Sequence, residues 1–449
     1  MRKICVNILT SRPFFIVMLI LVGMFGVGSL SVSGYRICAQ SWPEQCPSYE
    51  DFRRGRQWVR VAQAGELVAA DQSLTSLIQE LHRELGPIAT IVPSYQAIAD
   101  RLVQRKNWVL SRAAMGAIND QANAAGIVIS SSSAGSARKH LMKKEYAEFA
   151  GIVDTTNAAD TGPVCVAIPQ DPTQSDRLRL AQLAGGVELA TFSSDNRGPL
   201  HVAQFITRHE LFHCIDAFYG FFRAGIKEAT SLSPRHTSSE TFADVGGVLW
   251  AYRDGLEVSF AASVAAARIV MPVQNAKDLG DPLERRLRAW HFGDSSEPPG
   301  FVHHYTTPGL DVAIHLISDS KRGGVVRKMS LGEITSLAYL ITTRYGADSG
   351  RALDGYKSAS DADAPLLKLM QEGNTKGRRE SERLRELGAA EPFLQRVLAA
   401  IEAPSAEHTF GAGIADQELD ALIADAITFA RDQLDSRRVA TSQSNLKQP

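Results

Sequence analysis

The sequence predicts an α+β fold in which a small mixed sheet and one long helix form the centre and helical regions lie on either side. Three short segments rich in β-branched residues predict the strands, at 126–130, 163–169 and 187–192. Apolar residues at three- and four-residue spacings predict helices before, between and after these strands. A chain of 449 residues suits two or three domains.

The composition is that of an ordinary globular protein. Hydrophobic residues make up 44% of the chain and charged residues 22%, which excludes a mainly disordered protein, a collagen and a polytopic membrane protein. Basic and acidic residues nearly balance, 48 against 49, and the formal net charge is −1. Because nucleic-acid binding usually needs a basic excess or a basic patch, we expect no nucleic-acid partner.

The first 35 residues have the order of a secretory signal. Three basic residues precede an uncharged run, 13–35, whose first part is strongly apolar and whose second part is thinned by Gly and Ser. The run also reaches the ~20 residues that span a bilayer. We therefore expect residues 1–35 to be a cleaved signal or an N-terminal anchor, with membrane association through residues 14–30 and the rest of the chain outside the cytoplasm. A buried globular helix is the alternative.

Export changes the interpretation of the cysteines. Cys38, Cys46, Cys165 and Cys214 would then lie together in a compartment that favours disulfides. The pairing Cys38–Cys46 and Cys165–Cys214 has the simplest geometry, and unpaired buried thiols are the alternative.

An HExxH pentad, His209-Glu210-Leu211-Phe212-His213, lies in a segment with helical periodicity. Four residues on a helix turn through about 400°, so both imidazoles lie on one face, where they can reach one zinc ion at roughly 2.0–2.1 Å. Glu210 lies about 100° round from His209, where it can take a proton from a metal-bound water. A buried structural histidine pair is the alternative.

A catalytic zinc needs a third protein ligand, and the downstream sequence offers one. Glu240 follows His213 by 27 residues and Asp244 follows on the same helical face. One carboxylate can bind the metal while the other accepts the free N–H of a liganding histidine. Gly246 and Gly247, just beyond, either let another backbone approach closely or end a turn.

HELFH followed by ETFAD resembles the gluzincin zinc metallopeptidases. The resemblance implies Zn²⁺ bound by His209, His213 and Glu240, with Glu210 as the general base and Asp244 orienting a histidine. It also implies a zincin-like core in which an edge strand ahead of the HExxH helix pairs with an extended peptide substrate. Residues 187–192 are the candidate strand, and a purely structural strand is the alternative.

The longer run HELFHCIDAFYG is also similar to the HExxHxxD helices of the anthrax-lethal-factor-like peptidases. Asp216 then supports the site from beside the ligands, or is an ordinary exposed helix acid. In that group a tyrosine seven residues before the third ligand assists the oxyanion, and this chain has Ser233 there. His236 is therefore the first candidate for that role, ahead of Tyr219 and Tyr305.

These patterns together predict a zinc-dependent peptidase that hydrolyses peptide bonds of peptide or protein substrates outside the cytoplasm. A zinc-binding envelope protein without turnover, acting as a binding or structural module, is the second interpretation. A helical structural protein with an accidental pentad is the third.

The chain divides into five expected regions. After the N-terminal segment come a helical region at 36–124, a zincin-like catalytic domain at 125–320, a helical region at 321–440 and a flexible tail at 441–449. Helix caps are expected at Ser73, at Asp416 and at Ser330, the last in a capping box with Glu333.

Overall fold

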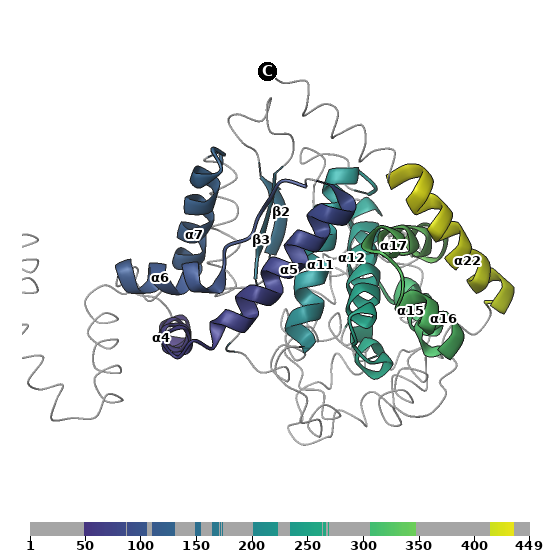
Figure 1. The fold of residues 1–449 in the computed structure, drawn as a ribbon, viewed down its shortest axis with the longest axis horizontal. Helices are drawn as coiled ribbons and strands as arrows, with labels where there is room; N and C mark the ends of the chain where they lie inside the picture. Colours follow the sequence, from purple (N-terminus) through teal and green to yellow (C-terminus); the bar gives the residue numbers. More distant parts are fainter. Residues whose placement is uncertain are drawn as a thin grey trace, which may run out of the picture.

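The computed structural model describes residues 49–86, 88–105, 110–130, 149–153, 164–169, 171, 173, 201–222, 234–262, 264–265, 268, 306–346 and 414–434. Within them the chain is mostly helical and carries one small sheet, an α+β architecture (Figure 1). The expected N-terminal segment 1–35, Cys38, Cys46, the expected strand at 187–192 and the tail at 441–449 lie outside these residues. None of the helices in the described ranges has the length and apolar character needed to cross a membrane.

In the described part of the chain, two helices precede the first strand and two more lie between the first and second strands. They are α4 (Tyr49–Gln63), α5 (Leu67–Leu85), α6 (Tyr95–Arg105) and α7 (Leu110–Ala124). The expected cap at Ser73 is wrong, because α5 begins six residues earlier, after a turn in which Gly65 adopts a φ of 76°. Such a positive φ favours glycine, so the turn fixes where α5 can start.

The sheet has three strands: β1 (Thr90–Ile91), β2 (Phe149–Val153) and β3 (Val164–Ile168). Their order is β1-β3-β2, with β1 parallel and β2 antiparallel to β3, so the sheet is mixed as predicted. The strand expected at 163–169 is confirmed as β3, a fully buried strand.

The strand expected at 126–130 is wrong apart from a single bridge residue, Ile129. This segment instead closes the end of α7. Gly126 adopts a φ of 70°, and the backbone N–H of Ile127 bonds back to the carbonyl of Ala122. Residues with strand propensity therefore form the turn that ends α7 at this glycine.

The helices after the sheet form the larger part of the described fold. They are α11 (His201–Tyr219), α12 (Pro234–Arg253), α15 (Thr307–Ser318), α16 (Ser320–Val326), α17 (Leu331–Tyr345) and α22 (Asp416–Phe429), and the π-helical turn η4 (Ala430–Leu434) continues α22. The central helix α11 contacts β2 and β3 as well as α12, and α12 in turn contacts α15 and α17 (Figure 1). The sheet and the C-terminal helices thus meet through α11 and α12.

Two of the expected helix caps lie in this part of the chain. The capping box is confirmed: the Ser330 N–H donates to Glu333 Oε2 at 2.8 Å, and the Glu333 N–H donates to Ser330 Oγ at 3.2 Å. The cap expected at Asp416 is displaced by one residue, because Asp416 is already the first residue of α22 and Ala415 precedes it without a side-chain cap. An acidic first residue still suits the positive end of the helix dipole.

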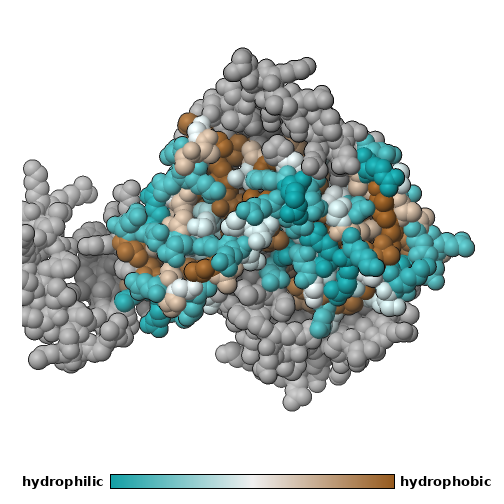
Figure 2. Space-filling view, in the orientation of Figure 1, coloured by the Kyte–Doolittle hydropathy of each residue, from teal (hydrophilic) through white to brown (hydrophobic). Residues whose placement is uncertain are grey.

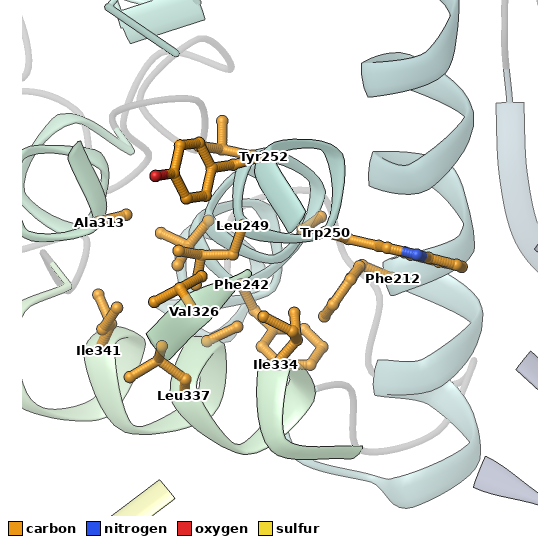
Figure 3. Packing of buried hydrophobic residues seen from close by; sticks show 14 of the residues in the cluster. Phe212, Phe242, Leu249, Trp250, Tyr252, Ala313, Val326, Ile334, Leu337 and Ile341 are labelled. Carbon is orange, nitrogen blue, oxygen red and sulfur yellow. The ribbon is translucent and has the colours of Figure 1, made fainter. Parts of the chain in front are cut away.

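Helix α5 joins two hydrophobic clusters. Its first half contributes Leu67 and Leu74 to the cluster around the sheet, and its second half contributes Leu77, Leu81 and Leu85 to the cluster around α11, α12 and α17. Figure 3 shows the second cluster, in which aromatic residues of α11 and α12 meet aliphatic residues of α17.

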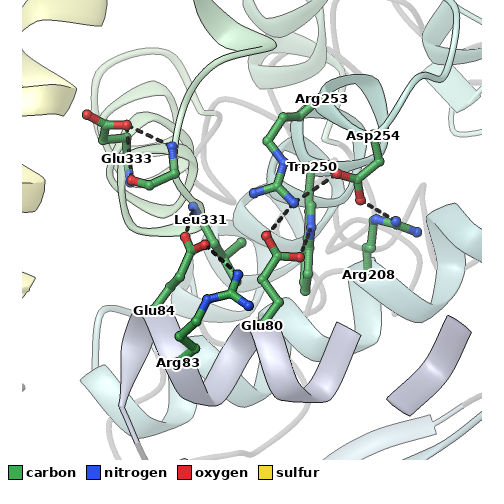
Figure 4. A network of polar contacts seen from close by, with 10 residues as sticks. Glu80, Arg83, Glu84, Arg208, Trp250, Arg253, Asp254, Leu331 and Glu333 are labelled. Atoms are coloured by element: carbon green, nitrogen blue, oxygen red, sulfur yellow. Dashed lines mark hydrogen bonds and ion pairs between the residues drawn. The ribbon is translucent and has the colours of Figure 1, made fainter. Parts of the chain in front are cut away.

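Polar contacts tie α5 to the same helices (Figure 4). Glu80 pairs with Arg253 at 2.6 Å and accepts a hydrogen bond from the Trp250 indole at 3.3 Å. Glu84 accepts the backbone N–H of Leu331, the first residue of α17. One face of α5 is thereby fixed to both α12 and α17.

The described surface in Figure 2 is largely hydrophilic, with apolar residues in separate patches. Large exposed apolar side chains come from four separate segments, at Val68, Val103, Val128 and Val325. Single exposed apolar residues of this kind are normal for a globular surface.

Candidate metal centre

Two glycines let α12 pack directly against α11. A Cβ at Gly246 would lie 2.2 Å from the Phe212 ring, and one at Gly247 would lie 3.1 Å from the His209 backbone nitrogen. Both glycines lie inside α12 and do not end a turn. Of the two roles considered for this pair, close backbone approach is therefore correct, and it brings the first half of α12 beside the HExxH residues.

The crossing places three buried side chains of the expected ligand set together. The Nε2 atoms of His209 and His213 are 3.2 Å apart. Glu240 Oε2 lies 3.6 Å from His209 Nε2, and Glu240 Oε1 lies 3.5 Å from His213 Nε2. Each of the three residues is at most 6% exposed, so water competes little for these atoms.

These separations fit one metal ion. Two ligand atoms that each lie about 2.0–2.1 Å from a tetrahedral ion are about 3.3–3.4 Å from one another. The observed separations are all within a few tenths of an ångström of that edge length, and two imidazoles with one carboxylate are donors that zinc accepts. The His-His-Glu group could therefore hold a metal ion.

Glu210 follows the first ligand on α11 and is half-buried. Burial alone lowers the pKa of His209, but Asp244 and, to a smaller extent, Glu210 raise it, and the net pKa is above its usual value. Asp244 and Glu210, on different helices, therefore both place negative charge near His209.

Asp244 holds the far side of the first ligand. Its Oδ1 lies 2.8 Å from His209 Nδ1, and Arg268 binds both of its oxygens, at 2.7 and 2.8 Å. This contact joins a ring nitrogen of His209 to a buried carboxylate, the arrangement that supports a liganding histidine. Thr306 donates a further hydrogen bond to Oδ2 at 2.7 Å.

The surroundings of Asp244 keep it ionised. The residue is fully buried, and burial raises the pKa of its carboxyl group. Arg268 and His209 more than offset that effect and hold the pKa well below its usual range. Asp244 thus presents a negative charge to His209.

Sequence reasoning missed Arg268, Thr306 and Ser239. Arg268 is a single charged residue in an otherwise apolar and small-residue run, 260–272, and that interruption was a usable sign of a buried ion pair. Thr306 carries no comparable signal, because its contact with Asp244 joins residues 62 positions apart.

Asp216 is not an exposed helix acid. It is fully buried, its Oδ2 accepts a hydrogen bond from Ser239 Oγ at 2.5 Å, and its Oδ1 accepts the backbone N–H of Phe222 at 2.7 Å. Ser239 Oγ also lies 3.4 Å from Nδ1 of His213. Asp216 is therefore linked through one hydroxyl to the second ligand.

The three oxyanion candidates have different outcomes. His236 lies in the first turn of α12, and its side chain is outside the described part of the structure. The Tyr219 hydroxyl donates to the Leu85 carbonyl at 2.7 Å and so links α11 to α5. Ser233 and Tyr305 lie outside the described residues.

A disulfide anchors the ligand helix to the sheet. Cys165 of β3 and Cys214 of α11 are bonded, with their Cα atoms 5.5 Å apart, and both are buried. This pairing is confirmed, and for these two cysteines the alternative of unpaired thiols is wrong. Because Cys214 directly follows His213, the bond fixes α11 at the level of the second ligand.

Comparison of the chain with protein-family models, with curated proteins and with solved structures finds no match.

Proposed function

We propose that this chain is a zinc-dependent peptidase of the gluzincin type that hydrolyses peptide bonds outside the cytoplasm. The observation that carries the proposal is the convergence of two imidazole nitrogens and one carboxylate at 3.2–3.6 Å, beside the glutamate of an HExxH helix. A structural histidine pair has no need of that third acceptor or of a neighbouring base.

Each residue has one task in the proposed reaction. When bound, zinc lowers the pKa of a coordinated water and polarises the scissile carbonyl. Glu210 accepts the proton of the attacking water and returns it to the leaving amine. Asp244 keeps His209 oriented, and His236 is the first candidate to donate a hydrogen bond to the developing oxyanion.

Two features support a site of action outside the cytoplasm. The N-terminal 35 residues have the composition of a signal or anchor. The buried Cys165–Cys214 disulfide suits an oxidising compartment, since disulfides are rare in proteins of the reducing cytosol.

The test compares Glu210→Gln with the wild-type chain. The variant should keep one zinc ion per chain after dialysis and a near-normal melting temperature, because Glu210 is not a ligand. Its cleavage of a broad peptide library should fall by about 10²–10⁴-fold, the usual contribution of a general base. Glu257→Gln, the same change at an exposed residue after α12, is the matched control and should cleave normally.

The other outcomes separate the alternatives. Zinc binding without any cleavage by the wild-type chain would favour the zinc-binding module without turnover. A wild-type chain that retains no zinc would mean that the pentad is accidental. Loss of zinc from Glu210→Gln would overturn the role given to Glu210.

A further inference from the structure

Two buried side chains, Ser239 and Asp216, lie one after the other behind the second proposed metal ligand, His213. Ser239 Oγ lies 3.4 Å from His213 Nδ1 on one side and 2.5 Å from Asp216 Oδ2 on the other. Ser239 and Asp216 are fully buried and His213 is 4% exposed. A hydroxyl that is fully buried forms its hydrogen bonds with protein groups and not with bulk water.

The chemistry of these groups fixes the direction of the protons. A serine hydroxyl has one proton to donate, and a carboxylate can only accept. The short contact to Asp216 is of the charge-assisted kind, so the Ser239 proton is directed at Asp216. The oxygen then offers His213 only lone pairs, which favours a proton on His213 Nδ1.

We propose that Ser239 is a positioning residue that selects the Nδ1-protonated tautomer of His213, with Asp216 as its anchor. In this tautomer the Nε2 lone pair faces the Nε2 of His209 and the carboxylate of Glu240, as metal binding requires. The inference rests on the proposed function, because it concerns a ligand of that metal site. His213 is then oriented by a hydroxyl group, whereas His209 is oriented directly by the carboxylate of Asp244.

The anchor is itself held in place. Asp216 Oδ1 accepts the N–H of Phe222, just after α11 ends at a turn in which Gly220 adopts a φ of 65°. The carboxylate therefore cannot rotate freely to present its other oxygen. Ser239 directly precedes Glu240, so one turn of α12 supplies both the third ligand and the tautomer control.

The first test measures zinc affinity by competition with a chelator. Ser239→Ala should weaken zinc binding by about 10–100-fold, the range typical of groups that orient a ligand. Ser336→Ala is the matched control, because it removes an equally buried hydroxyl that bonds only to the backbone of α17 in the described structure. The control should stay within about twofold of the wild-type affinity.

The second test reads the tautomer directly. Nitrogen NMR of histidine-labelled, metal-free wild-type protein should show His213 with a protonated Nδ1, its signal being assigned by its loss in His213→Gln. In Asp216→Asn the side-chain amide can donate to Ser239 and release the hydroxyl proton toward Nδ1, so the population of the other tautomer should rise.

Two results would overturn the inference: a His213 protonated at Nε2 in the metal-free wild-type protein, or a Ser239→Ala variant that binds zinc as tightly as the wild type. Failure of the proposed function looks different. A wild-type chain that binds no zinc refutes that function, while the NMR measurement on the metal-free protein still decides the tautomer.

Discussion

At the scale of single residues, the choice of the third metal ligand lies within one turn of α12. Glu240 has an oxygen 3.5–3.6 Å from each histidine Nε2, and His236 lies one turn earlier on the same helix. We expect Glu240→Ala to lose zinc affinity by more than the roughly 10–100-fold typical of supporting residues. His236→Ala should keep zinc and slow turnover by about 10²-fold.

Zinc titration and peptide cleavage on the two variants check this prediction together. The reverse pattern, with zinc lost from His236→Ala and kept in Glu240→Ala, would replace the carboxylate ligand by a third histidine. The chain would then leave the gluzincin type while keeping the HExxH chemistry.

The candidate metal-binding residues could be predicted from the sequence because their spacings are helical. His209 and His213 share a face by periodicity alone, and Glu240 and Asp244 repeat that spacing on the next helix. Ser239 and Arg268 could not be assigned, because their partners lie 23–26 residues away on other turns of the fold. The packing of α12 on α11 brings Ser239 to Asp216 and His213.

At the scale of elements, the site depends on how closely α11 and α12 pack. Gly246→Ala would place a methyl group in the Phe212 ring, which must shift, and we expect a loss of about 1–3 kcal/mol in the free energy of unfolding. Gly324→Ala is the control, since a Cβ in that part of α16 meets nothing within 4 Å. It should stabilise the helix slightly, by up to about 1 kcal/mol.

Urea denaturation measures both glycine variants, and zinc affinity is measured beside it. The change at Gly246 should also weaken zinc binding, since Glu240 and Asp244 move with α12. A variant at Gly246 that is as stable as the control would mean that the helices can separate without cost.

The disulfide is the second element-scale constraint. Cys165 and Cys214 close a loop with a sequence separation of 49 residues. Replacing both by alanine should lower the free energy of unfolding by about 4 kcal/mol in the chain-entropy description. The midpoint of urea denaturation, measured without reductant, checks this value, and an unchanged midpoint would contradict a disulfide in the native chain.

Elements with local signals were predictable, and those that depend on distant pairing were not. The HExxH helix and β3 have the periodicity and composition of their class, and both are present. The two-residue strand β1 has no such signal, because it is defined by parallel pairing with β3, more than 70 positions later. The roles of Gly246 and Gly247 likewise depend on a distant element, because both glycines pack against residues of α11.

At the scale of the whole molecule, the N-terminal 35 residues and the disulfide both predict that the chain lies outside the cytoplasm. A phosphatase reporter that folds only outside the cytoplasm should be active when it is fused to the C-terminus. Deleting residues 2–30 should abolish its activity, because the basic and apolar parts of the segment are then removed. A reporter that works only in the cytoplasm would refute the proposed location.

The hydrogen bond from Leu331 to Glu84 joins residues 247 positions apart. A ribosome adds about 5–20 residues per second, so roughly 10–50 s separate the synthesis of the two partners. During that interval the larger hydrophobic cluster lacks α17, and loop closure over so long a chain is slow. We expect the nascent chain to remain unfolded long enough to be threaded through a narrow translocation channel. Late closure of the core would therefore be compatible with the proposed export, in which folding follows translocation.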